Sequence, residues 1–229
     1  MSPAAVTIAA NAAGSAEPRL KITEIFRSLQ GEADSVGWPT TFVRLTGCPL
    51  RCQYCDTAYA FHGGEWWTIE AIVAKVREAG MQYVCVTGGE PLAQTRCHAL
   101  LATLCDAGFR VSLETSGAMR WREVDARVVR VIDIKTPDSG ESQRNRYEDL
   151  VALQPADQLK FVICSRTDYE WSRDCIARHG LTQHGGLLFS PSHDQIEPRE
   201  LADWMLADKL NVRFQLQLHK LLWGNEPGR

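Results

Sequence analysis

Apolar and polar positions alternate along most of the chain in a pattern that predicts strands and helices in turn. Short runs rich in β-branched residues predict strands at 41–46, 83–87, 110–114, 128–134, 159–163, 187–190 and 212–218. Apolar residues at helical spacing predict helices in between, and the positions expected on their buried faces include Ile69, Ile72, Val73, Val76, Leu100, Leu101 and Leu104.

Capping residues mark where these helices begin and end. Thr68 suits the N-cap of one helix, which Gly80 would end, and Gly108 would end the next. A capping-box match at 167–170 predicts the start of a third helix, and a proline predicts a fourth over 198–207.

About six strand–helix repeats predict an α/β fold, with a parallel sheet covered by helices and either open or closed into a barrel. The 229 residues fall short of the ~250 that are typical of a full eight-fold barrel, so a partial barrel of about six βα units fits better. Reactive groups in either arrangement are expected where the strands end at their C-terminal side.

Composition narrows the class of protein. The hydrophobic fraction of 45% supports a packed core, and the net charge of −3 argues against sequence-independent nucleic-acid binding. No apolar run approaches the ~18 residues that a membrane-spanning helix needs. We therefore expect no nucleic-acid partner and no membrane span.

The N-terminal segment 1–19 is expected to be a disordered extension of a single domain over 20–229. No lysine or arginine precedes Arg19, and Asn11 and Gly14 interrupt the apolar stretch, so a secretion signal is not indicated. A cytoplasmic location follows as an expectation, and clustered thiols there indicate metal ligands rather than disulfides.

Three of the eight cysteines, Cys48, Cys52 and Cys55, lie within eight positions. Three thiolates match an iron–sulfur cluster that keeps one iron open, whereas a structural zinc site needs a fourth ligand such as His62. The chain has no second paired cysteine motif, which favours the cluster over zinc or a chance grouping. The others are expected to be small buried hydrophobes: Cys85, Cys97, Cys105, Cys164 and Cys175.

The Cys-x3-Cys-x2-Cys spacing, with Gly88-Gly89-Glu90-Pro91 after a later strand, resembles the radical S-adenosylmethionine (SAM) enzymes. The resemblance implies a partial (βα)6-type TIM-like barrel, a [4Fe-4S] cluster whose open iron chelates SAM, and reductive cleavage of SAM to a 5′-deoxyadenosyl radical. Gly88 and Gly89 would allow a close approach of the backbone to SAM.

The rest of the chain resembles one branch of that superfamily, 7-carboxy-7-deazaguanine synthase of the queuosine pathway. The motifs that carry this are Glu24-Ile25-Phe26, Leu29-Gln30-Gly31-Glu32, Phe42-Val43-Arg44, Cys55-Asp56-Thr57, Glu114-Thr115-Ser116-Gly117 and Gln217-Leu218-His219-Lys220. The resemblance implies a lyase that converts 6-carboxy-5,6,7,8-tetrahydropterin to 7-carboxy-7-deazaguanine with loss of ammonia.

The same resemblance implies the roles of individual residues. Thr57 matches the family's Mg²⁺ ligand. The residues that would bind substrate are Leu29, Gln30, Gly31, Glu32, Arg44, Thr87, His219 and Arg229. The residues that would bind SAM are Tyr54, Asp56, Gly89, Glu90, Glu114, Ser116, Asp133, Ile134, Lys135, Ser190 and Pro191.

Plainer roles are open for several of these residues. Arg44 could form a structural ion pair with Glu24, and Thr57 could cap a turn. Lys135 could neutralise Asp133 or another acid. Gln215, Gln217 and His219 share one face of the predicted last strand, which could point into the site or into solvent.

Two other functions would share the cysteine motif. A glycyl-radical activase would act on a partner protein and would not need Gln30, Glu32 and Thr57, and a metal-binding regulatory module would lack catalysis. The enzyme reading further implies a one-electron donor such as flavodoxin and a homodimer, for which the last strand and the tail are candidate contacts.

Overall fold

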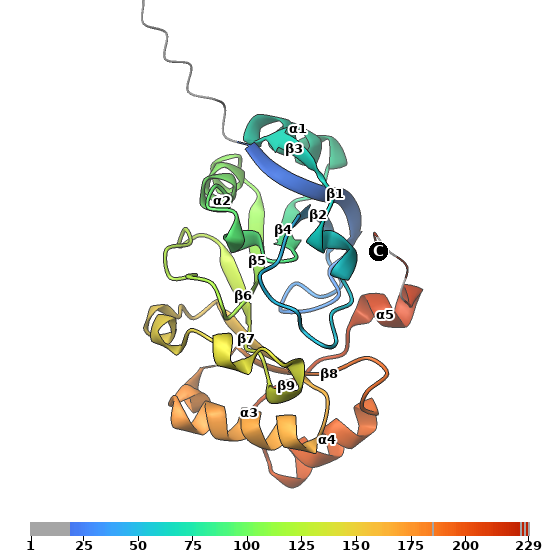
Figure 1. The fold of residues 1–229 in the computed structure, drawn as a ribbon, viewed down its shortest axis with the longest axis vertical. Coiled ribbons are helices and arrows are strands. Elements are labelled where there is room, and N and C mark those ends of the chain that lie inside the picture. The colour runs from blue at the N-terminus through green and yellow to red at the C-terminus, as the bar shows by residue number, and fades with distance from the viewer. Residues whose placement is uncertain (1–18, 185, 225, 227, 229) are drawn as a thin grey trace, which may run out of the picture.

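The computed structural model describes residues 19–184, 186–224, 226 and 228, and these form one curved mixed sheet with helices packed on it (Figure 1). The sheet has nine strands in the order β3-β1-β2-β4-β5-β6-β7-β8-β9. The strands are β1 (Arg19–Leu29), β2 (Pro39–Leu45), β3 (Glu65–Thr68), β4 (Tyr83–Gly88), β5 (Arg110–Ser116), β6 (Val129–Asp133), β7 (Gln158–Ile163), β8 (Leu187–Pro191) and β9 (Arg213–Phe214).

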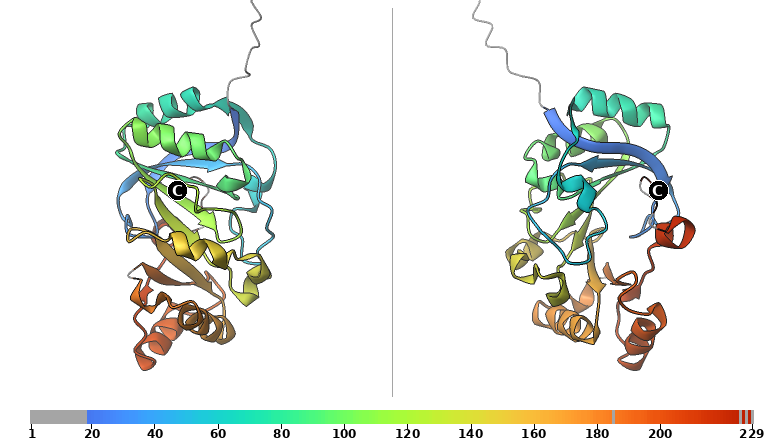
Figure 2. Two further views of the ribbon diagram at one scale, coloured as in Figure 1. Left: turned by 90° about the vertical axis from the view of Figure 1, so that its left-hand side faces the viewer. Right: turned by 45° about the vertical axis from the view of Figure 1, so that its right-hand side comes forward.

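The α-helices are α1 (Ile69–Ala79), α2 (Cys97–Asp106), α3 (Arg166–Arg178), α4 (Pro198–Ala207) and α5 (Leu218–Trp223). The two views of Figure 2 show α1 and α2 covering one end of the sheet and α3 and α4 the other. Over the part of the chain that the structure describes, no helix combines the length and the apolar character needed to cross a membrane.

The predicted caps of the first helix and the buried faces of the first two helices are confirmed, whereas α2 has Ala107 as its C-cap and Gly108 follows it with φ of 87°. The Thr68 hydroxyl accepts a hydrogen bond from the amide of Ala71, and Gly80 ends α1 in the left-handed conformation with φ of 76°. The buried side chains of α1 and α2 include all seven apolar positions that the periodicity selected, and they join one core with the inner strands.

The predicted cap of α3 was displaced by two residues. Helix α3 begins at Arg166, and the Ser165 hydroxyl, rather than Thr167, accepts the hydrogen bond from the amide of Asp168. Thr167 lies exposed within the first turn. Ser165 and Thr167 both carry a hydroxyl that suits an N-cap, so the sequence alone does not decide at which of them the helix begins.

Parallel pairing runs from β2 through β4, β5, β6, β7 and β8 to β9, so the α/β fold class is confirmed. The strand–helix alternation is less complete than predicted, because 3-10 helices replace an α-helix between β6 and β7. The antiparallel strands β1 and β3 were not predicted. In β1 an irregularity between Ile22 and Glu24 breaks the alternation that marks a strand.

The predicted last strand over 212–218 was wrong beyond Phe214. The chain leaves the sheet there, and the Gln215 side chain bonds the backbone of Ala33, accepting from its amide at 2.6 Å and donating to its carbonyl at 3.1 Å. The amide of Leu218 then donates to the carbonyl of Gly31 at 3.0 Å, and α5 begins. The segment after β9 thus meets the turn between β1 and β2 and bridges the two ends of the open sheet.

Candidate active site

A cavity of about 500 Å³ lies where the parallel strands end, enclosed by the curve of the sheet. Most of the predicted site residues line it: Leu29, Gln30, Gly31, Glu32, Arg44, Cys48, Cys52, Tyr54, Cys55, Asp56, Thr57, Thr87, Gly89, Glu114, Ser116, Asp133, Lys135 and His219. Glu90, Ile134, Ser190 and Pro191 are buried behind this lining. Arg229 lies outside the described residues.

The three clustered cysteines share one end of the cavity, half-buried and free of disulfides. Across the described ranges, no three His, Cys, Asp or Glu side chains converge on a single ion position. Three thiolates can bind three irons of a [4Fe-4S] cluster and leave the fourth iron open, whereas a structural zinc ion takes four protein ligands. The residues present therefore fit a [4Fe-4S] cluster.

The other five cysteines lie on other parts of the chain. Cys85, Cys97 and Cys175 are buried as predicted, whereas Cys105 and Cys164 are only half-buried.

Burial raises the pKa values of the three thiols in the cysteine loop, that of Cys52 to about 11. Metal binding at the loop therefore has to displace protons from these thiols.

Gly89 allows the cysteine loop to pack against the end of β4. A Cβ at this position would lie 2.4 Å from the carbonyl oxygen of Gly47 and 2.8 Å from Cβ of Cys48. The next amide, that of Glu90, donates to the same Gly47 carbonyl at 2.8 Å. The glycine pair therefore serves the seating of the loop, besides any contact with a ligand.

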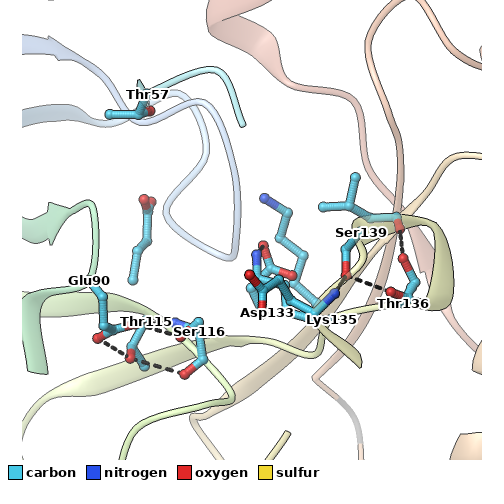
Figure 3. Close-up of polar contacts among 12 residues, drawn as sticks. Thr57, Glu90, Thr115, Ser116, Asp133, Lys135, Thr136 and Ser139 are labelled. Atoms are coloured by element: carbon cyan, nitrogen blue, oxygen red, sulfur yellow. Dashed lines mark hydrogen bonds and ion pairs between the residues drawn. The ribbon is translucent and has the colours of Figure 1, made fainter. Parts of the chain in front are cut away.

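Glu90 supports the cavity wall from behind (Figure 3). Its carboxylate accepts hydrogen bonds from the amide and hydroxyl of Ser116, both at 2.7 Å, from the Thr115 hydroxyl at 2.8 Å and from the amide of Leu92 at 2.9 Å. Burial raises its pKa, although these donors favour the ionised form. The carboxylate fixes Ser116, which does line the cavity.

Asp133 and Lys135 lie together in the lining of the cavity (Figure 3). The Lys135 ammonium is 3.0 Å from Oδ2 of Asp133 and 5.5 Å from the ring centre of Tyr54. The Tyr54 hydroxyl and Oδ1 of Asp133 are buried without a hydrogen-bond partner in the described structure. Lys135 does neutralise Asp133, and the two unpartnered polar atoms nearby suit contact with a polar ligand.

Gln30, Thr87 and Glu114 form a second polar network in the cavity. Nε2 of Gln30 donates to Oε1 of Glu114 at 3.1 Å, and the Thr87 hydroxyl donates to Oε2 at 3.0 Å. These contacts fix the direction in which the Gln30 amide presents its polar edge. Glu114 is thus an internal acceptor for two side chains of the cavity.

Arg44 forms the ion pair that the sequence left open and also lines the cavity. Its Nε donates to Oε1 of Glu24 at 2.7 Å, and the Tyr59 hydroxyl donates to the same oxygen at 2.8 Å. Only Nε is used in this pair, so the terminal guanidinium nitrogens are left for an acidic ligand.

Asp56 and Thr57 lie together at the mouth of the cavity. The Thr57 hydroxyl donates to Oδ1 of Asp56 at 2.8 Å, and the Lys220 ammonium is 3.3 Å from Oδ2. Burial acts to raise the pKa of Asp56, but Thr57 and Lys220 together hold it below its usual value. Two hard oxygen groups side by side suit a magnesium ion that takes its other ligands from substrate and water.

His219 faces the cavity from α5 rather than from a strand. Its ring packs on Gly31, where a Cβ would lie 2.1 Å from Nδ1. Burial lowers its pKa, which favours the neutral ring. Of the two orientations that the sequence left open, the structure has the one that faces the site.

Several lining residues were not predicted, among them Lys160, Ser192, His193, Asp194 and Lys220. Lys160 sits inside the buried strand β7, and its Nζ is 2.6 Å from Oε2 of Glu32. A lysine in an otherwise apolar strand was the available signal, because a buried charge needs a partner. Gln217 Nε2 donates to Oε1 of the same carboxylate at 2.9 Å.

Comparison with known proteins agrees with this arrangement. The Radical SAM superfamily matches residues 42–132, which include the cysteine loop. The fold resembles that of QueE from Escherichia coli with a TM-score of 0.73 at 24% identity, covering 88% of this chain and 95% of that one. The fold and the cysteine loop therefore define a radical SAM enzyme with a partial TIM-like barrel.

Relatives with higher sequence identity show which family within this class the chain matches. The 7-carboxy-7-deazaguanine synthase of Chlorobaculum tepidum is 46% identical over 212 residues, which are 91% of this chain and 96% of the relative. That of Koribacter versatilis is 43% identical and covers 90% of this chain and 98% of its own. The chain belongs to the 7-carboxy-7-deazaguanine synthase family.

Proposed function

We propose that this chain is the lyase that converts 6-carboxy-5,6,7,8-tetrahydropterin to 7-carboxy-7-deazaguanine with loss of ammonia, in the biosynthesis of queuosine and related 7-deazapurines. The observation that carries the proposal is one cavity with three free thiols at one end and Gln30, Arg44 and Glu114 on its walls. The thiols suit a redox cluster, and the polar side chains on the walls suit a pterin that carries a carboxylate.

Cys48, Cys52 and Cys55 would hold the cluster. When reduced and with SAM bound at its open iron, the cluster would supply the one electron for cleavage of SAM, whose deoxyadenosyl group would then accept a hydrogen atom from C6 of the pterin. Gly89, Ser116, Asp133 and Lys135 are placed to contact SAM, together with Tyr54, Asp56 and Glu114. Glu90, Ile134, Ser190 and Pro191, which lie behind the lining, would support this site from outside it.

The remaining polar groups would bind and orient the substrate. Gln30 and Glu32 offer an amide and a carboxylate to the donor and acceptor edge of the pterin, and Thr87 lies beside them. The backbone of residues 29–31 and the ring of His219 line the same side of the cavity. Arg44 would bind the substrate carboxylate with its terminal guanidinium nitrogens.

Thr57, with Asp56 beside it, would complete a Mg²⁺ site when the substrate supplies further oxygens. The ion would orient the substrate carboxylate near the cysteine loop. The lyase further requires a one-electron donor such as flavodoxin, and we propose that it works as a cytoplasmic homodimer.

Product analysis tests this proposal. The chain is reconstituted with iron and sulfide without oxygen, reduced, and incubated with SAM, Mg²⁺ and the carboxytetrahydropterin. We expect 7-carboxy-7-deazaguanine and ammonia in equal amounts, and neither from Cys52→Ala. An intact cluster with bound SAM but no deazaguanine product would contradict the proposed substrate.

A further inference from the structure

The pair formed by Lys160 and Glu32 joins two distant parts of the chain inside the cavity. Lys160 lies on β7, Glu32 lies in the turn after β1, and both side chains line the cavity while being about nine-tenths buried. The geometry points to Lys160 as a positioning residue that holds Glu32 as an oriented carboxylate for the N–H edge of the pterin. This inference rests on the proposed function.

Each oxygen of Glu32 already has one donor. Nζ of Lys160 is 2.6 Å from Oε2, and Nε2 of Gln217 is 2.9 Å from Oε1. A carboxylate has about four acceptor sites, so each oxygen keeps one for a ligand in the cavity. The two donors come from different elements, which fixes the plane of the carboxylate.

The charge on Glu32 matters because of what the substrate presents. The pyrimidinone edge of a pterin carries an amino group and a ring N–H, and two neighbouring donors match an ionised carboxylate. A protonated Glu32 would place an O–H donor against a donor, which leaves a buried polar group unpaired. Burial alone would favour that protonated form.

Lys160 is the group that opposes this protonation. Burial acts to raise the pKa of Glu32, but the Lys160 ammonium and its hydrogen bond lead the contributions that hold it below the usual value. Other charged or titratable groups near the pair are His219, Glu114, Asp133 and Asp56. Burial lowers the pKa of His219 below its ordinary value, which favours the neutral ring.

The test compares substrate affinity across pH in three variants. Lys160→Met removes the charge and keeps much of the volume, Lys160→Arg keeps the charge, and Lys160→Met with Glu32→Gln removes the titrating carboxyl. Equilibrium binding of the carboxytetrahydropterin to SAM-loaded protein is measured from about pH 7 to pH 9, and each Kd is divided by the wild-type Kd at the same pH. The titration of the substrate itself affects both Kd values equally, so it drops out of this ratio.

Without Lys160, burial raises the Glu32 pKa, so the carboxyl is protonated at the low end of the range and ionises as pH rises. We expect Lys160→Met to bind about tenfold more weakly than wild type at pH 7 and to recover toward wild type at pH 9. Lys160→Arg should stay near wild type, and the double variant should be weak at every pH.

The outcomes separate the inference from the proposed function. A loss of affinity in Lys160→Met that is the same at every pH, or no loss at all, would overturn the role given to Lys160. Wild-type protein that fails to bind the pterin would instead contradict the proposed function. Retained cluster absorbance and SAM binding show that each variant is folded, and if Lys160→Met fails to fold, Lys160→Gln takes its place.

Discussion

Gly31 and His219 show how single residues set the shape of the substrate side of the cavity. The ring of His219 occupies the space that a side chain at position 31 would take. The carbonyl of Gly31 also accepts the amide of Leu218, so the glycine bonds α5 as well as making room for its histidine. The absence of a side chain is therefore a requirement of the site.

Gly31→Ala is expected to displace the His219 ring, because the new Cβ would lie 2.1 Å from Nδ1. The ring is the end of a side chain and can move, so we expect KM for the pterin to rise about tenfold with little loss of folding stability. Steady-state kinetics measures this. In a His219→Ala background, Gly31→Ala should cause no further rise in KM, and additive losses in the double variant would show that the histidine is not the cause.

Residues at the ends of strands were predictable from the sequence, because motifs such as Glu114–Gly117 interrupt apolar runs at points where parallel strands converge. Lys160 was missed because it lies within its strand rather than after it. The partners of Gln215 and Gln217 were missed because they lie 182 and 185 residues away, across the closing edge of the sheet. Contacts at such separation leave no local pattern.

At the scale of elements, the cysteine loop depends on the glycine turn after β4. Gly89→Ala would place its Cβ 2.4 Å from a backbone oxygen, which cannot rotate away. We expect reconstituted protein to hold far fewer than the about four irons per chain of a full cluster, measured by iron content and visible absorbance. Cys105→Ala, a cysteine outside the loop, is the control and should keep its cluster.

Substitution at the start of helix α3 tests the assignment of Ser165 as its N-cap. Ser165→Ala removes the acceptor for the amide of Asp168 and the hydrogen bond from Ser165 to Asp138, so we expect a loss of about 1 to 2 kcal/mol in the free energy of unfolding. Thr167→Ala, in the exposed first turn, should change it by less than about 0.5 kcal/mol. Urea titration measures both, and the reverse order would return the cap to Thr167.

Elements with strong periodicity and clear caps, such as α1 and α4, were predicted to within a residue or two. Those that depend on distant contacts were not. β1 carries an irregularity, and β9 is short: the amide of Gln215 still donates to the carbonyl of Phe189 on β8, but its side chain bonds the backbone of Ala33 and the chain then turns into α5. Tertiary hydrogen bonds decided these boundaries.

At the scale of the whole molecule, Gln215 closes the open sheet. Ala33, which it bonds twice, has φ of 64°, a left-handed conformation that costs a non-glycine residue about 1 kcal/mol. Both residues are buried, so the hydrogen bonds have no water to replace them. The closure positions Glu32, Gln217 and His219 in the cavity.

Gln215→Ala should therefore lower the free energy of unfolding by about 1 to 3 kcal/mol, because it leaves the amide and carbonyl of Ala33 unpaired. It should also raise KM for the pterin more than it changes SAM binding. Urea unfolding and steady-state kinetics measure the two effects. Gln183→Ala, at an exposed glutamine, is the control, and equal effects from the two variants would contradict the role of Gln215 in closure.

The ratio of product formed to SAM consumed tests the central claim most directly. In the proposed reaction SAM is regenerated, so a limiting amount of SAM should support many turnovers of the carboxytetrahydropterin to 7-carboxy-7-deazaguanine with SAM largely recovered. An activase of another protein would instead consume SAM with each event and make no deazaguanine. Consumption of SAM without this product, by protein with a full cluster, would contradict the account.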